Sequence, residues 1–402
     1  MYSAMHQFNG DPFEGGGLQN PNSLIFPFLN FLFAFCFLNY RFYLPLYLKS
    51  VGVNETGIGG LMSLFPLTSF ILIFPLGMLA DRVNARRVIS VGAIGAIFFG
   101  LLMPTVETSG AMAAVMIFGG ASSSLYFVGI NALFFKHVEE KNRGIRTALF
   151  FAGASLGQGT GTLLGGYLID RVGPEAIFMQ GVVSAAAMLA AGLLAPSAPM
   201  FKINFSDYLK DLRKPAALIV VAVTFVIQTH VGVEFVSYTL FMERAVGLSG
   251  SEIGLIFIIV SSWMIFWGLV AGRYYDGSRK PVMMLGLAVL WSGIFQYLTV
   301  YANDFTSMAF LRLAHTFGDG FFNVIIMVLV GITFPRGRVG GNFGFIIMVN
   351  TMAIFIANNV SGLLMQGDRY GLPFQVSGVV MVLAGLLMLL SRKPILRALN
   401  IE

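Results

Sequence analysis

The sequence predicts an all-α integral membrane protein with twelve transmembrane helices, arranged as two pseudo-symmetric bundles of six. Of its 402 residues, 56% are hydrophobic and only 11% are charged, whereas a soluble domain has about 25% charged residues. Apolar runs of about 20 residues, the length that a helix needs to cross a bilayer, recur along the whole chain. The 47 glycines agree with this fold, because membrane helices pack closely through small residues.

Breakers such as Gly52, Pro104, Pro174 and Pro281 separate the apolar segments. We expect the spans at residues 24–48, 57–80, 87–106, 111–135, 146–169, 176–196, 216–241, 252–275, 281–302, 306–333, 341–366 and 372–391.

The polar segment 197–215 is the longest connection, and we interpret it as a cytoplasmic linker between the two halves. It would join an N-terminal bundle, 24–196, to a C-terminal bundle, 216–391. Residues 1–23 contain no pattern of a cleavable signal, so we expect a flexible cytoplasmic tail there and a second tail at 392–402.

The basic residues predict the orientation. Nineteen of the 25 lysines and arginines lie in the loops after the even-numbered spans or in the C-terminal tail. The opposite side has only Lys49, Arg171, Arg244 and Arg369, with Arg41 close by, and Arg312 falls inside a span. Cytoplasmic loops are enriched in lysine and arginine, so both termini are expected in the cytoplasm.

The two halves resemble each other in sequence. The loop after the second span contains Gly77-x-x-x-Asp81, and the loop after the eighth contains Gly272-x-x-x-Asp276, 195 residues later. Internal repeats of this kind build many transporters, with the substrate site between them.

The segment Gly77-x-x-x-Asp81-Arg82-x-x-x-Arg86-Arg87 resembles the signature loop of the major facilitator superfamily. The resemblance covers about residues 24–391 and implies that family's fold. It also implies that Gly77, Asp81, Arg82, Arg86 and Arg87, with Asp276 in the degenerate second copy, latch the cytoplasmic helix ends in one conformation. The alternative is that these charges only fix the topology.

Two departures weaken the interpretation as a drug–proton antiporter of that superfamily. The middle of the fourth span, Met116–Gly120, has no arginine, and the fifth span has Gly161-Thr-Leu-Leu-Gly-Gly without the proline of the antiporter pattern.

Ionisable residues inside spans are candidates for function because burying them in a membrane is unfavourable. Arg312, His315 and Asp319 share one face of the tenth span, and His230 and Glu234 are one turn apart on the seventh. The resemblance implies that both faces line the central cavity. The Arg–His–carboxylate face of the tenth span is also similar to the proton site of sugar–proton symporters. We therefore expect these five residues to couple transport to protons; a fixed ion pair and direct binding of a charged solute are the alternatives.

Polar side chains near mid-membrane are candidates for binding the solute, and we select Asn30, Tyr126, Asn131, Tyr238 and Asn323. Each could instead hold helices together. Further polar side chains inside spans could also form the solute site: Asn39, Arg41, Ser122, Ser123, Ser124, Asn350, Asn358 and Asn359.

These observations predict a secondary active transporter that moves a small solute by alternating access, with proton-coupled symport as the expected mechanism. The 39 Phe and 21 Met residues support the alternative, an exporter of amphipathic drugs or lipids. Enzyme motifs are absent from the sequence, and the single cysteine, Cys36, can form neither an internal disulfide nor a metal cluster. We expect no cofactor, no metal and no nucleic acid, and a monomer in a bacterial inner (plasma) membrane, with protons, solute and lipid as its partners.

Overall fold

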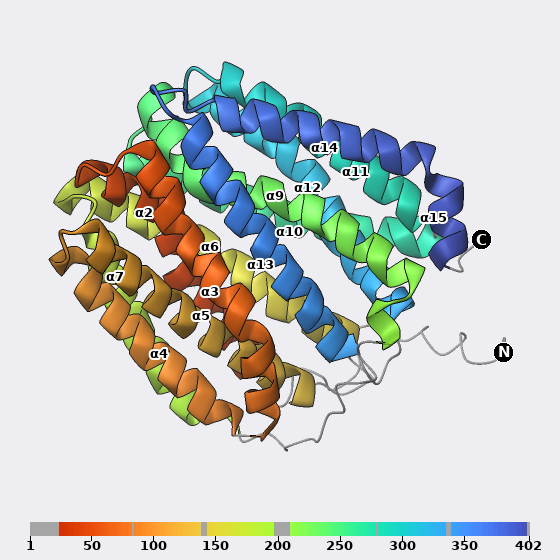
Figure 1. Cartoon of the computed structure of the whole chain (residues 1–402), viewed down its shortest axis with the longest axis horizontal. Helices are drawn as coiled ribbons and strands as arrows, with labels where there is room; N and C mark the ends of the chain where they lie inside the picture. Colours follow the sequence, from red (N-terminus) through yellow and green to blue (C-terminus); the bar gives the residue numbers. More distant parts are fainter. Residues whose placement is uncertain are drawn as a thin grey trace.

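The computed structural model describes residues 24–82, 84–137, 143–196, 210–278, 280–334 and 339–399. Regular structure within these ranges is entirely helical, and the long helices run roughly side by side (Figure 1). The N-terminal tail 1–23 and most of the linker predicted at 197–215 lie outside the described residues.

The first span, Ile25–Ser50, consists of α1 (Ile25–Phe33), a π-helical turn (Ala34–Leu38) and α2 (Asn39–Ser50). The N-terminal half continues with α3 (Glu55–Arg82), α4 (Ala85–Leu102), α5 (Ser109–His137), α6 (Arg143–Val172) and α7 (Ala176–Leu194). The C-terminal half contains α9 (Pro215–Leu240), α10 (Gly250–Ser278), α11 (Pro281–Leu298), α12 (Phe305–Thr333), α13 (Val339–Leu364) and α14 (Leu372–Leu390). A short helix, α15 (Arg392–Leu399), lies in the segment expected to be the C-terminal tail.

Each of the twelve expected spans overlaps one of these long helical segments, so the predicted all-α membrane fold is confirmed. By length and hydropathy, eleven of them are apolar enough to cross a membrane. The exception is α6, because many glycines, several threonines and Gln158 dilute its apolar residues. Large apolar side chains such as Val183, Leu194 and Leu390 are strongly exposed, as expected for surfaces that face lipid rather than water.

The pseudo-symmetry extends to the backbone. Gly52 and Gly247, 195 residues apart, both follow the first helix of their half and have φ of 87° and 82°. Gly173 and Asp368, also 195 residues apart, have φ of 110° and 61°. Left-handed residues at matching positions in both halves indicate two copies of one helical unit, with glycine where the turn requires positive φ.

The two bundles meet where α3 packs on α13 and α6 packs on α10. We call the side with few lysines and arginines, which holds the loops after the odd-numbered spans, the basic-poor side. Near this side, a Cβ atom on Gly59 would lie 2.7 Å from Gly362 Cα, and one on Gly166 would lie 1.9 Å from Gly250 O. The backbones of the two halves therefore touch there, and Figure 1 shows α3 and α13 drawing apart toward their other ends.

Polar contacts between the bundles accompany these crossings. The Asp170 carboxylate at the end of α6 accepts hydrogen bonds from the backbone N–H groups of Gly250 and Ser251, at 2.7 and 2.8 Å, and so caps α10. On the other side of the interface, Glu55 pairs with Lys49 and accepts a 3.0 Å hydrogen bond from the Tyr370 hydroxyl. The basic-poor side is thus closed in this conformation.

Candidate functional site

A cluster of charged side chains lies inside the C-terminal bundle, between α9, α11 and α12. It contains all five residues that we predicted for proton coupling: His230 and Glu234 on α9, and Arg312, His315 and Asp319 on α12. We call these five residues the charge cluster. Helical periodicity explains why these side chains come together: the two residues on α9 share one face of that helix, and the three on α12 share one face of theirs.

Glu234 and Arg312 form the ion pair at one end of the charge cluster. The Arg312 guanidinium also donates a 3.0 Å hydrogen bond to Gln296 Oε1 on α11 and lies 4.3 Å from the ring centroid of Tyr238. Its charge is thereby compensated from three directions although its side chain is only 2% exposed. Such pairing is what an arginine buried in a membrane requires.

The orientation of both histidine rings is fixed by backbone carbonyl groups. Nδ1 of His315 lies 2.9 Å from the carbonyl oxygen of Ser292, and Nδ1 of His230 lies 2.7 Å from that of Ile227. A carbonyl oxygen only accepts hydrogen bonds, so each Nδ1 has the hydrogen and each Nε2 turns toward the carboxylates.

At the other end of the charge cluster, the Asp319 carboxylate lies between the two histidines and Ser292. Its Oδ2 lies 3.1 Å from His315 Nε2 and 3.9 Å from His230 Nε2, while its Oδ1 accepts a 2.8 Å hydrogen bond from the Ser292 hydroxyl. His315 Nε2 is also 3.3 Å from Glu234 Oε1 and is aligned for a linear hydrogen bond with neither carboxylate. A bare nitrogen lone pair this close to two carboxylates would be repelled, so a proton or a metal ion belongs at this contact.

A proton fits this contact without moving any side chain. A metal ion is the other possibility, because ligand atoms of His230, His315 and Asp319 lie within 4.8 Å of one another. Zinc would sit about 2.0–2.2 Å from each ligand and would bring the three atoms to about 3.3 Å from one another, so His230 would have to shift. The geometry therefore suits a proton better than a zinc ion.

Access to water differs among the members of the charge cluster. The histidine side chains are 0–1% exposed, whereas the Glu234 and Asp319 side chains are each 12% exposed. With neutral histidines the group has one positive and two negative charges, and the carboxylates are its more exposed members.

The five residues selected for solute binding are dispersed. Asn30 donates to the carbonyl of Phe150, joining α1 to α6, and Asn131 donates to Phe127 of its own helix, both at 2.8 Å. Tyr126 is fully buried and stacks on Phe33, and Tyr238 lies against Arg312 of the charge cluster. Asn323 is exposed, with its amide directed at Met264 of α10. These five do not form one common site in this conformation.

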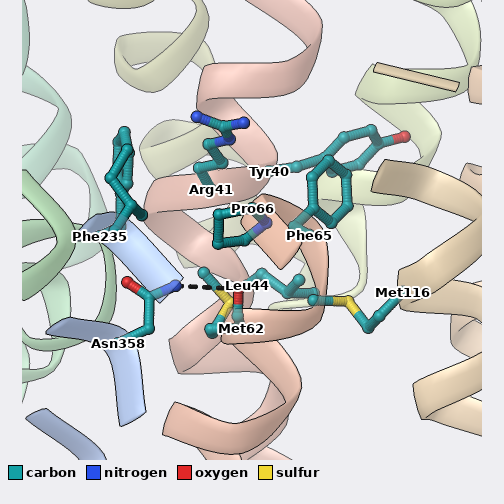
Figure 2. A pocket seen from close by; sticks show the side chains of 10 residues that line it. Tyr40, Arg41, Leu44, Met62, Phe65, Pro66, Met116, Phe235 and Asn358 are labelled. Atoms are coloured by element: carbon teal, nitrogen blue, oxygen red, sulfur yellow. Dashed lines mark hydrogen bonds between the residues drawn. The ribbon is translucent and has the colours of Figure 1, made fainter. Parts of the chain in front are cut away.

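A cavity between the bundles gathers a different set of side chains (Figure 2). Its empty volume is about 310 Å³ including its opening, and its enclosed part holds about one water molecule. The lining residues are Tyr40, Arg41, Leu44, Met62, Phe65, Pro66, Met116, Phe235, Ile354 and Asn358.

The cavity bears on two sequence-based expectations. We expected both charged faces to line the central space; the charge cluster lies within the C-terminal bundle, with its two carboxylates each 12% exposed, and α12 contributes no residue to this cavity. Arg41, which the sequence placed within the first span and close to the basic-poor side, lies inside that span and lines the cavity. The signal for Arg41 was present in the sequence, as a charge within an apolar segment.

The predicted latch lies largely outside the described residues. The side chains of Asp81, Arg82 and Asp276 are not described, and Arg86 and Arg87 occupy the first turn of α4. The latch, with Gly77, stays a prediction.

Comparison with known proteins decides the family. The sequence profile of the Major Facilitator Superfamily matches residues 28–276 and, in a second match, residues 220–401. The chain belongs to the Major Facilitator Superfamily. The overlap of the two matches is expected for a superfamily fold built from repeated halves.

Relatives within the superfamily include drug-resistance proteins. The quinolone resistance protein NorA of Staphylococcus aureus (strain COL) is 23% identical over 356 residues, which is 85% of this chain and 90% of NorA. The multidrug resistance protein Stp of Mycobacterium tuberculosis (strain CDC 1551 / Oshkosh) is 29% identical over 150 residues, 36% of this chain and 27% of Stp.

Solved structures of superfamily transporters share the fold. The nucleoside transporter NupG has a TM-score of 0.72 at 15% identity, covering 92% of this chain and 99% of NupG. A POT family transporter in complex with a thioalcohol conjugated peptide reaches 0.73, at 12% identity and with 93% and 96% coverage. The human organic anion transporter MFSD10 reaches 0.66 at 17% identity, with 92% and 99% coverage.

The Glu234–Arg312 pair predicts a stability effect. Glu234→Gln leaves the buried Arg312 without its counter-ion, and breaking one partner of a buried pair costs about 3–5 kcal/mol. We expect the detergent-solubilised variant to unfold at a clearly lower temperature, and the double variant Glu234→Gln/Arg312→Gln to regain much of the loss. A single variant as stable as the wild type would show that the pair does not hold α9 to α12.

Proposed function

We propose that this superfamily member is a proton-coupled symporter of a small solute, and that the charge cluster is its proton site. The supporting observation is the arrangement around Asp319: two oriented imidazoles and a serine hydroxyl surround a carboxylate that retains partial access to water. Burial and charged neighbours of this kind are typical of functional carboxylates in membranes.

Alternating access would proceed by rocking of the two bundles about the site between them. With the basic side in the cytoplasm, as loop charges favour, the basic-poor side is the external face. The closed contacts at Gly59 and Gly166 would then belong to a conformation that excludes the outside. We propose a bacterial plasma membrane as the location and a monomer as the working unit.

The proton would control this cycle by changing the charge of the cluster. A proton shared by His315 and the two carboxylates neutralises their excess negative charge, and its release restores that charge inside the bundle. Because burying net charge in the membrane is unfavourable, the protonated and deprotonated clusters favour different exposures to water. In a symporter, the protonated and loaded carrier would then carry solute and proton across together.

Export of amphipathic compounds is the second candidate, and the similarity to NorA over 85% of the chain favours it. The missing fourth-span arginine and fifth-span proline oppose it. Direction therefore has to be measured in the same experiment as the ligand class.

The test is a thermal-shift screen of the purified protein at about pH 6 and pH 8, with and without EDTA. The panel contains sugars, nucleosides, amino acids, carboxylates and amphipathic drugs, and the ligands that bind are followed into proteoliposomes with an imposed pH gradient. We expect stabilisation by one polar class, stronger at the lower pH and unchanged by EDTA, and uptake into the more alkaline compartment. Stabilisation by many unrelated amphiphiles, with extrusion toward the acidic compartment, would replace the symporter by the exporter; a loss of binding in EDTA would instead favour a metal at the charge cluster.

A further inference from the structure

Arg41 is a cation inside the first span, at the interface of the two bundles. Its guanidinium carbon lies 5.1 Å from the ring centroid of Phe235 on α9 and 5.8 Å from that of Phe65 on α3. Figure 2 shows the guanidinium between these two rings. Arg41 is therefore held by one aromatic ring from each bundle.

No carboxylate pairs with Arg41 among the residues that the structure describes, and its guanidinium makes no hydrogen bond to them. Arg312 is the contrasting case, because Glu234, Gln296 and Tyr238 all compensate its charge. An arginine kept in a membrane only for helix packing would be paired in the same way. Arg41 is partly exposed and cation–π contacts supply only part of its compensation, so its guanidinium is open to a further partner.

The surroundings of Arg41 define what else a ligand would need. Leu44, Met62, Pro66 and Ile354 make most of the cavity wall apolar. Tyr40 and Asn358 are the other polar side chains of the lining. The Asn358 amide donates to the carbonyl of Met62 at 2.9 Å, while its Oδ1 and the Tyr40 hydroxyl are buried without a hydrogen-bond partner. A buried acceptor without a donor is unfavourable, and a ligand N–H or O–H would satisfy it.

We propose that Arg41 binds the anionic group of the transported solute, and that this solute is a small organic acid with an aromatic or other apolar body. The guanidinium fork matches a carboxylate in geometry and charge. The rings of Phe65 and Phe235 and the apolar wall suit the body of such an acid, and Asn358 can accept from a donor on it, once the bundles separate enough to widen the enclosed part of the cavity beyond one water molecule. The proposal rests on the function proposed above and names the substrate class of the cavity.

The site also explains how solute and proton would be linked. Phe235 directly follows Glu234 on α9, so the anion site and the charge cluster share one turn of that helix. The charged groups near this turn of α9 are Arg41 from α2, its own His230 and Glu234, and Arg312, His315 and Asp319 from α12. With neutral histidines these charges cancel, so an incoming anion leaves one excess negative charge, which a proton on the cluster neutralises.

The test uses the purified full chain in detergent, with benzoate, 4-hydroxybenzoate, indole-3-acetate and cyclohexanecarboxylate as probes and the neutral amide of each as its partner. We expect at least one acid to raise the unfolding temperature while its amide does not. Arg41→Gln should weaken binding of that acid by about thirtyfold or more, and Arg41→Lys by less. The proposal is overturned if no acid stabilises the wild type, if acid and amide act alike, or if Arg41→Gln binds the acid as tightly as the wild type.

Two controls separate this proposal from its alternatives. Without ligand, Arg41→Gln should unfold at or above the temperature of the wild type, because no partner is left unpaired; a marked drop would make Arg41 structural and overturn the proposal. Asp319→Asn should still bind the acid. Binding of the acid without uptake driven by a pH gradient would refute the proton-coupled function and keep the anion site. Proton-driven uptake of uncharged solutes alone would refute the anion site and keep the proton-coupled function.

Discussion

Asp319→Asn is expected to abolish accumulation of the solute driven by a pH gradient and to leave exchange of solute across the membrane intact. Exchange returns the carrier loaded and needs no net proton movement, whereas accumulation needs a group that gains and loses a proton in each cycle. Asparagine retains the shape of aspartate and can still accept from the Ser292 hydroxyl, which donates to Asp319 at 2.8 Å. It cannot hold the charge on which His315 and His230 converge.

The expected effect is large. A gradient of about two pH units stores about 2.7 kcal/mol per proton, which supports about hundredfold accumulation at one proton per solute. In the variant, the internal solute concentration should rise only to the external concentration. Asp319 is a cleaner target than Glu234, because its partners are histidines that can become neutral, while Glu234 compensates an arginine.

Asp304→Asn is the matched control on the same helix. Asp304 caps α12 outside the membrane, and the hydrogen bonds from the backbone and hydroxyl of Ser307 lower the pKa of its carboxyl group. The control thus removes a carboxylate charge from α12 but keeps the cap, since asparagine also caps helices, and transport should be unchanged. Accumulation in Asp319→Asn equal to that of the control would refute the proton site, and loss of exchange together with accumulation would make the cluster structural.

Much of the fold was predictable because a bilayer imposes one demand on every span. Each crossing segment must be helical and apolar over about 20 residues, so the apolar runs predicted the long helices within a few residues. The same demand made the charges inside α9 and α12 conspicuous, and helical spacing grouped them by face. The loop that begins at Gly77 then indicated the family, and the 195-residue repeat indicated that the chain is built from two halves.

The partners across helices were less predictable. Asn30 could face the cavity or a neighbouring helix, and only packing decides that it bonds to Phe150 of α6. Ser292 and Gln296, one turn apart on α11, complete the charge cluster, yet nothing in their own span distinguishes them from ordinary polar residues. Arg41 was visible as a charge, but its lack of a counter-ion is a property of the assembled interface.

Gly166→Val and Gly59→Val are each expected to prevent closure of the basic-poor side and to stop transport. A Cβ on Gly166 would lie 1.9 Å from Gly250 O, and one on Gly59 would lie 2.6 Å from Asn358 O. Backbone atoms on both sides cannot rotate away as a side chain would, so the bundles must separate. Overpacking of this kind costs typically about 1–3 kcal/mol, or about five- to 150-fold in the population of the closed form.

Closure can be measured directly because the natural Cys36 is buried and resists labelling. The exposed Val172 and Tyr301 lie on the basic-poor side of the two halves, so Val172→Cys/Tyr301→Cys provides one label site on each bundle. We expect a longer distance between spin labels in either glycine variant than in the parent. Gly60→Val is the control, since a Cβ there meets no atom within 4 Å, and it should keep both the short distance and transport. An unchanged distance in Gly166→Val would mean that the two glycine crossings do not form the closed gate; a longer distance with full transport would mean that the cycle does not pass through this conformation.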